Sequence, residues 1–534
     1  MTPKTICTVL LSLLLPAALC AQAMPGMDMG HHEEAPISTE KLGEVHFPVS
    51  CKPISEVPFE RGIALLHSFG YTQAERQFKA IATVDPTCAM AHWGIAMSQY
   101  HELWGRPDQS ALEVGVAQMQ QASALATNPK LKTKITSREL SYIFALSDFY
   151  ARAPVSYQSG ADAYVRGMAT LHAENPGDVE GAAFYALALL ADVAPNDTSL
   201  SNERKALDVL LPLFAKYPNH PGLAHYIIHT CDTPALAQQG LEAAKVYAKI
   251  APSSPHALHM PGHIFARLGM WQDDIDSIPG PDDMKGRSAR YVNELRSIYL
   301  LEMHDWPAIQ ALQPMMGGNG TDTWYVYWAQ GIAAGYLHDA PLAKAALARY
   351  DDVMAMVKSS GNGYMLNSMA IYRNEMLGWK AFIAGDADAA VTAMRAAADQ
   401  QDKLGQGEVD LPAREMLGDL LMQLHKPQDA LAEYKVALTL SPNRLNGLLS
   451  AGEAAEAAGL PGEAKPFYTL AAASTHNGKD TTRSDVAHAV QVATATAQPK
   501  AAPPPAAAAT AQSKPAAKSK PKVAPRVSAP TSQQ

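Results

Sequence analysis

Apolar side chains recur every three to four residues through most of the chain between residues 51 and 475, and runs of β-branched residues are few. This spacing predicts amphipathic α-helices, because it places the apolar side chains on one face of each helix. A longer period is superimposed on it, in which a glycine is followed after twelve residues by an alanine. Five such pairs occur: Gly62 and Ala74, Gly331 and Ala343, Gly378 and Ala390, Gly418 and Ala430, and Gly452 and Ala464. A recurring pair of this kind predicts one structural unit repeated along the chain.

Two further positions define the repeated unit. An aromatic residue follows the alanine by four positions at Phe78, Tyr434 and Tyr468, and a proline closes the unit at Pro86 and Pro442. The step from Gly418 to Gly452 is 34 residues, whereas the step from Gly378 to Gly418 is 40, which predicts an extension around Leu404 to Leu411. Small residues are needed where two helices cross, since glycine or alanine lets the helix axes approach to about 8 Å.

This pattern resembles the tetratricopeptide repeat (TPR), a unit of two antiparallel helices, over about residues 59 to 475. The resemblance implies an all-α fold, a right-handed α-solenoid of stacked helix hairpins, because a single hairpin cannot bury its apolar face. It also implies a concave groove lined by the first helix of every pair, in which a protein or peptide partner would bind.

The beginning of the chain differs from the repeats. Residues 1–23 have the features of a signal peptide: Lys4, an apolar core from Val9 to Leu19, and a small-x-small cleavage site at Ala21 to Ala23. The mature protein is therefore expected to be exported, to the periplasm or the extracellular space. Residues 24–50 form a Met/His-rich segment, which is compatible with copper ligation or with a flexible terminus that holds no metal.

The end of the chain is different again. We place the TPR-like solenoid at residues 51–475, a boundary segment at residues 476–493 and an Ala/Pro/Lys tail at residues 494–534. The tail has too few large apolar residues to fold, so it is expected to be disordered. Its six basic residues favour either weak contact with anionic envelope polymers or the role of a solvated spacer.

Charge is distributed unevenly. All 52 acidic residues and 36 of the 43 basic residues lie between the signal peptide and the tail, which gives this body a net charge of −16. An acidic body argues against nucleic acid as a partner and fits cationic partners, metal ions or simple solubility. No segment after the signal peptide approaches the roughly 18 consecutive apolar residues needed to cross a bilayer, so no membrane span is expected.

Three cysteines remain after cleavage, Cys51, Cys88 and Cys231, and an odd number permits at most one internal disulfide. The pair Cys51 and Cys88 is favoured, because it would fasten the N-terminal extension to the first repeat. Cys231 lies two residues after a histidine and could be a soft metal ligand, but a buried structural cysteine is favoured.

The strongest chemical signal is a duplicated His-x-x-x-His pattern. His225 and His229 lie 34 residues before His259 and His263, and each pair begins four residues after a proline, Pro221 or Pro255. Residues at i and i+4 share a helix face, so the four imidazoles are expected on adjacent faces of two neighbouring helices. The TPR resemblance implies that these positions point into the groove.

Four converging imidazoles could hold a divalent transition metal ion, zinc or copper. His220, His256 and Asp232 are possible additional ligands or outer-sphere groups, and Asp232 would be the general base if the site were catalytic. Two features oppose an ideal site: Pro261 and Gly262 lie between His259 and His263 and could kink that helix, and groove histidines can instead bind backbone or carboxylate groups.

The stretch from His220 to Trp271 also looks like a group of exported bacterial TPR proteins with a His-rich central repeat pair, as do Phe47 to Cys51 and Asp85 to Gly94. That resemblance implies fold and location, not chemistry. Three hypotheses follow: an exported protein-binding scaffold with a metal-binding histidine cluster in its groove; a metal-dependent hydrolase using the same cluster; and a purely structural TPR protein without metal.

Overall fold

The computed structural model describes residues 40–101, 103, 106–131, 135–193, 197, 199–277, 289–317, 320–359, 363–404 and 411–495. The expectations for the signal peptide, the Met/His-rich residues 24–39, almost the whole tail and the centre of the 404–411 extension concern residues outside these ranges. A compact unit ends at Ala493, and residues 494–534 form a separate unit. None of the described helices is long and apolar enough to cross a membrane.

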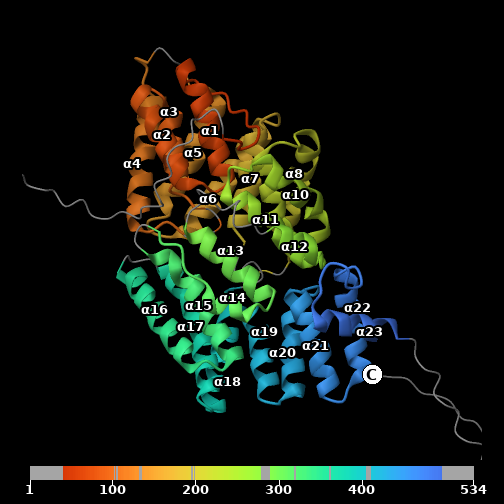
Figure 1. Cartoon of the computed structure of the whole chain (residues 1–534). Helices are drawn as coiled ribbons and strands as arrows, with labels where there is room; N and C mark the ends of the chain where they lie inside the picture. Colours follow the sequence, from red (N-terminus) through yellow and green to blue (C-terminus); the bar gives the residue numbers. More distant parts are fainter. Residues whose placement is uncertain are drawn as a thin grey trace, which may run out of the picture. The chain divides into compact units, whose positions relative to one another are not determined.

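The described residues of the compact unit form eleven consecutive helix hairpins, as the repeat period predicts. The first six hairpins stack side by side, and so do the last five (Figure 1). The first helices are α1 (Glu56–His67), α3 (Ala89–Met97), α5 (Ser137–Arg152), α7 (Val179–Ala191), α9 (Pro221–Cys231), α11 (Pro255–Leu268), α13 (Ala289–Glu302), α15 (Trp324–Leu337), α17 (Gly363–Ile383), α19 (Ala413–Gln423) and α21 (Leu445–Ala457).

The second helices are α2 (Tyr71–Val84), α4 (Gln109–Ala126), α6 (Tyr157–Glu174), α8 (Ser201–Lys216), α10 (Ala237–Ile250), α12 (Trp271–Ser277), α14 (Trp306–Ala311), α16 (Ala340–Ser359), α18 (Ala387–Gln401), α20 (Pro427–Leu440) and α22 (Pro461–Ser474). A final helix, α23 (Ser484–Thr494), lies in the segment that we placed between the solenoid and the tail, and Val486 and Ala489 of α23 are fully buried. Over its described residues the protein is an all-α solenoid of TPR-like helix hairpins.

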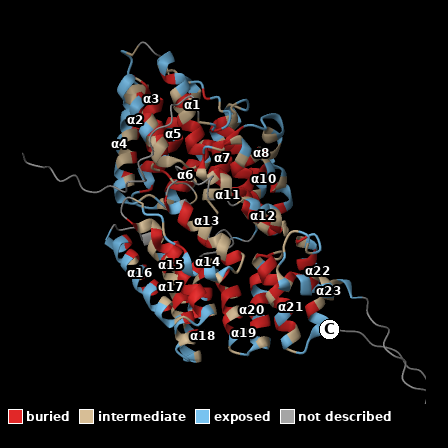
Figure 2. Ribbon diagram, in the orientation of Figure 1, coloured by how far each residue is buried: buried red, intermediate tan, exposed pale blue. Residues whose placement is uncertain are grey.

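The glycines of the repeat lie where the two helices of a hairpin cross. A Cβ atom added to Gly418 would lie 2.5 Å from the ring of Tyr434, and one added to Gly452 would lie 2.4 Å from the ring of Tyr468. The same contact joins Gly62 to Phe78. The glycine therefore makes room for the aromatic ring, as the sequence pattern predicts. Figure 2 shows the buried residues on the sides where helices face one another.

An extended segment, residues 41–52, runs along the N-terminal ends of five first helices, and we call it the N-terminal strap. Its backbone bonds in turn to the residues that precede or begin α11, α9, α7, α5 and α3: Ser253, Asn219, Glu180, Glu139 and Asp85. A disulfide between Cys51 and Cys88 fastens its end, which confirms the favoured pairing. Cys231 is buried outside any disulfide, also as expected.

Two residues of the strap fit closely into the solenoid. Phe47 is fully buried against the rings of Phe59, Trp93 and Tyr142. Gly43 has a φ of +91°, and a Cβ atom there would lie 2.7 Å from Cδ of Pro221, so only glycine suits this position. The strap therefore packs as part of the fold and covers the edge of the repeats that it crosses.

Candidate metal centre

The two histidine-bearing helices begin where the sequence predicts. Pro221 opens α9, and His220 caps it by accepting the backbone N–H of Leu223 at Nδ1 (3.2 Å). Pro255 opens α11, and Ser254 caps it by accepting the N–H of Ala257. Although Pro261 lies inside it, α11 continues as a single helix to Leu268.

Three imidazoles from these helices converge, and we call His225, His229 and His256 the histidine cluster. One candidate ligand atom from each lies within 4.8 Å of the others. The ring of His225 has its centroid 4.5 Å from that of His229 and 4.8 Å from that of His256. The structure thus groups two of the four expected ligands with His256, which the sequence indicated only as an additional group.

The hydrogen bonds of His225 fix its tautomer. Its Nδ1 lies 2.6 Å from the backbone carbonyl oxygen of His67, and because a carbonyl can only accept, Nδ1 carries the hydrogen. The other nitrogen, Nε2, therefore presents a lone pair. Nε2 of His225 and Nε2 of His256 are both buried, and neither has a hydrogen-bond partner among the described residues. A metal ion is one group that such lone pairs can bind.

The three imidazoles of the cluster are held neutral, which is the state that binds metals. Burial lowers the pKa of His225 to about 3. Burial, reinforced by the neighbouring imidazoles, lowers the pKa of His229 and of His256 well below the usual value. At neutral pH the cluster therefore carries no charge of its own.

His259 and His263 lie further along α11. The ring centroid of His259 is 5.2 Å from that of His256, and the ring centroid of His263 is 5.1 Å from that of His259. His263 bonds through Nδ1 to Oδ2 of Asp232 (3.0 Å), and Asp232 also accepts from Nε of Arg267 (2.9 Å). Of the four ligands expected from the sequence, His225 and His229 therefore belong to the cluster, His259 lies beside it, and His263 pairs with Asp232.

A cavity of about 80 Å³ with both polar and apolar walls adjoins His259 and the His263–Asp232 pair. His259, His263, Asp232 and Arg267 contribute to its wall, together with residues of α13 and of the segment before α21. Burial lowers the pKa of His259 to about 3. Burial raises the pKa of Asp232, but His263 and Arg267 together lower it by more. The pKa is therefore below its usual value, and this carboxylate is ionised.

Phe69 covers the histidine cluster and was not indicated by any sequence signal. Its ring centroid lies 4.4 Å from that of His225, 5.4 Å from that of His229 and 5.4 Å from that of His256. Its backbone has a φ of +54°, in the left-handed region that costs a residue with a side chain roughly 1–2 kcal/mol. Phe69, His229 and His256 are half-buried, whereas His225 is sealed.

Little of the surface of α9 is exposed. Ten of the eleven residues of α9 are buried, because α9 packs against its neighbouring helices and also against α1, although seven helices lie between α1 and α9 along the chain. A half-buried row of rings remains, which we call the ring strip: His101, Tyr71, Phe69, His229, His256, His259 and His263.

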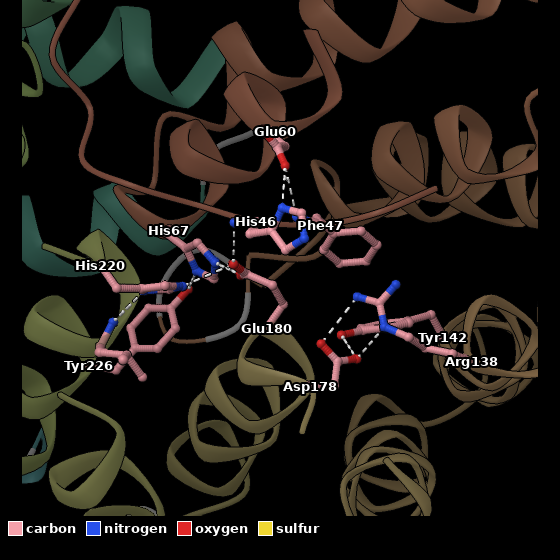
Figure 3. A network of polar contacts seen from close by, with 11 residues as sticks. His46, Phe47, Glu60, His67, Arg138, Tyr142, Asp178, Glu180, His220 and Tyr226 are labelled. Atoms are coloured by element: carbon pink, nitrogen blue, oxygen red, sulfur yellow. Dashed lines mark hydrogen bonds and ion pairs between the residues drawn. The ribbon is translucent and has the colours of Figure 1, made fainter. Parts of the chain in front are cut away.

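A second set of buried groups lies beside the cluster, and we call His67, Glu180 and His220 the glutamate network (Figure 3). Glu180 accepts from Nε2 of His67 (2.5 Å) through one oxygen and from Nε2 of His220 (3.0 Å) through the other. Because Nδ1 of His220 already accepts from Leu223, its Nε2 must carry hydrogen and has no lone pair for a metal. The glutamate network is therefore closed by hydrogen bonds.

Glu180 is ionised although it is buried. Desolvation alone would raise its pKa, but the imidazoles of His220 and His67 hold the pKa well below the usual value of a glutamate. Sequence reasoning had no means to find this residue, since His67 and Glu180 lie far from the histidine pairs along the chain and follow no repeat spacing.

The fold and the site together define a class: an exclusively helical repeat protein, over its described residues, with a histidine-rich buried centre between two adjacent repeats. Among solved structures, the chain is similar to the APC/C hetero-tetramer Cut9–Hcn1, with 13% identity, 82% of this chain and 76% of that chain covered, and a TM-score of 0.30. It is also similar to the TPR domain of P58(IPK), with 12% identity, 82% and 98% coverage, and a TM-score of 0.19. No family model and no curated protein matches the chain.

Proposed function

We propose that the protein is an exported TPR-like scaffold for a protein or peptide partner, and that it holds one divalent transition metal ion, zinc or copper, in the histidine cluster. A single observation carries the metal part of the proposal. One imidazole nitrogen from each of His225, His229 and His256 lies within 4.8 Å of the other two, and the buried Nε2 atoms of His225 and His256 make no hydrogen bond to any described residue.

The donor set suits such an ion. Two nitrogens on one tetrahedral zinc ion lie about 3.3 Å apart, given bonds of about 2.0 Å, so a modest inward movement of the side chains would complete the site. His225 already has the outer contact that metal-bound histidines usually make, an N–H donated to a backbone carbonyl. His259, whose ring centroid lies 5.2 Å from that of His256, is the candidate fourth ligand, with His263 and Asp232 further along.

Export and partner binding have separate support. The signal-like residues 1–23 and the disulfide between Cys51 and Cys88 both fit an oxidising compartment. The ring strip is the half-buried part of the inner surface, and its rings suit a peptide that presents apolar or aromatic side chains. Binding to a peptide array that is lost in Tyr71→Ala would support this role; an array without any binder would count against it.

Elemental analysis tests the metal. Protein purified without chelator should contain close to one zinc or copper per chain, and His225→Ala and His256→Ala should each lose it. His92→Ala is the matched control, since His92 is half-buried in α3 and bonds to Gln118 outside the cluster. A wild-type protein that contains no metal and melts at the same temperature with and without EDTA would refute the metal site.

A metal-dependent hydrolase is the second candidate, and the cavity beside His259 favours it. A catalytic ion must keep one coordination position open to water, and the ionised Asp232 with His263 could accept the proton. Metal-loaded protein should then hydrolyse an ester or amide, and Asp232→Asn should abolish turnover while the metal content is retained. If no such turnover is detected, the hydrolase hypothesis is rejected and the scaffold hypothesis remains.

A further inference from the structure

The glutamate network and the histidine cluster are connected by one backbone carbonyl. His67 is the last residue of α1, where the carbonyl groups of a helix have no partner within the helix. The carbonyl oxygen of His67 accepts the Nδ1–H of His225 (2.6 Å). The side chain of the same residue bonds to Glu180, so a single residue contacts both sets of groups.

The ring of His67 is held from two sides. Nε2 donates to Glu180 (2.5 Å), and Nδ1 lies 2.9 Å from the hydroxyl of Tyr226, which neighbours His225 on α9. Gly222 of α9 leaves room for this ring, because a Cβ atom there would lie 2.5 Å from Nδ1 of His67. Figure 3 shows the side chains of His67 and His220 on one side of the Glu180 carboxylate, with the ring of Tyr226 beside them. The end of α1 is thus fixed against α9 at the level of the cluster.

We infer that Glu180 is a positioning residue for the metal centre: through His67 it holds the carbonyl that orients His225, and its carboxylate supplies negative charge beside a neutral set of ligands. This inference rests on the proposed metal site. The charge matters because an uncompensated divalent ion in a buried, apolar setting is costly, and a nearby carboxylate lowers that cost. Glu180 itself stays outside the coordination sphere, since both of its oxygens accept imidazole N–H groups.

Glu180→Gln separates this role from a general structural one. The amide has one accepting oxygen for two imidazole donors and carries no charge, so the hydrogen bond from His67 or from His220 is lost, or His67 must change its tautomer. We expect the affinity for Co²⁺, measured in competition with a chromogenic chelator, to fall about 10- to 100-fold, the usual effect of losing an outer-sphere partner. The visible absorption band of bound Co²⁺ should shift as His225 reorients.

Glu139→Gln is the matched control. Glu139 is also 1% exposed, lies in the first turn of a first helix and bonds to the strap at Ser50, but it does not contact the cluster. This variant should melt at a lower temperature than the wild type and bind Co²⁺ with unchanged affinity and spectrum. If Glu180→Gln fails to fold, Tyr226→Phe tests the same connection, since it removes only the hydroxyl that bonds His67; a few-fold loss of affinity and a shifted spectrum are expected.

The outcomes are distinct. Wild-type protein that binds no Co²⁺ removes the proposed metal site itself. Wild-type protein that binds Co²⁺, while Glu180→Gln or Tyr226→Phe binds it with the same affinity and spectrum, overturns the inference and leaves the metal site intact. A loss of affinity in Glu139→Gln as large as in Glu180→Gln would also overturn it, because the effect would then come from weakened packing of the strap.

Discussion

Glu375 should make the stability of the protein fall as the pH rises. This residue of α17 is fully buried and accepts a hydrogen bond from the indole N–H of Trp328 at Oε2 (2.7 Å), while its other oxygen has no hydrogen-bond partner among the residues that the structure describes. Burial raises the pKa of Glu375 from 4.5 to about 8, against the smaller opposing effect of the Trp328 hydrogen bond. At neutral pH the folded protein therefore holds a proton on this carboxyl.

The direction and size of the effect follow from proton linkage. Between pH 4.5 and about 8 the folded chain keeps the proton and the unfolded chain has lost it, so the free energy of unfolding falls as pH rises. Each pH unit corresponds to about 1.4 kcal/mol, which over this interval amounts to at most about 5 kcal/mol. Glu375→Gln retains an oxygen for Trp328 and cannot ionise, so it should remove this dependence.

Calorimetric melting between pH 5 and pH 9 measures the effect. The melting temperature of Glu375→Gln should equal that of the wild type near pH 5 and exceed it by a growing margin toward pH 9. Glu113→Gln, at an exposed position of α4, is the control and should follow the wild type throughout. Parallel curves for Glu375→Gln and the wild type would show that the carboxyl is already ionised in the folded state, contrary to our reasoning.

Three further perturbations probe the cover of the cluster, the helix crossings and the strap. Phe69→Gly should speed the release of bound metal to EDTA without changing the amount bound, because it removes the covering ring and suits the φ of +54°; an unchanged rate would refute the covering role. Gly452→Ala should destabilise by about 1–3 kcal/mol in urea titrations, since its Cβ would lie 2.4 Å from Tyr468, whereas Gly462→Ala, where a Cβ meets nothing within 4 Å, should be neutral or slightly stabilising. Cys51→Ser should cost about 2–4 kcal/mol and make the strap sensitive to protease, while Cys231→Ser should leave the strap protected.

The helix crossings were predictable from the sequence because their contacts lie within one hairpin. Gly418 and Tyr434 are 16 residues apart, and the requirement for a small residue under a large ring is local to the unit that repeats. The starts of α9 and α11 were predictable for the same reason, since Pro221, Pro255 and the Ser254 cap act within one turn of helix.

The membership of the cluster was not predictable in this way. Matching positions in successive repeats were assumed to lie opposite each other, which would pair His225 and His229 with His259 and His263. In the structure the ligand atoms of His225 and His229 converge with that of His256, near the start of α11 and before His259. The contacts of His67 and Phe69 with the cluster span more than 150 residues, and no periodic signal in the sequence encodes them.

The cluster could consist of neutral histidines that pack without a metal ion. His256→Phe distinguishes this possibility from a metal site, because the two predict opposite changes in melting temperature. A buried polar atom without a hydrogen bond costs about 1–3 kcal/mol, and the buried Nε2 of His256 makes no hydrogen bond to any described residue. In a protein without metal, phenylalanine of similar size would remove that cost and raise the melting temperature or leave it unchanged. In a protein that holds an ion, the same substitution removes a ligand, so the melting temperature should fall to that of the EDTA-treated wild type and lose its response to EDTA. A stabilised, EDTA-insensitive His256→Phe beside an EDTA-insensitive wild type would mean that the three imidazoles are packing groups, and the proposed metal centre would have to be abandoned.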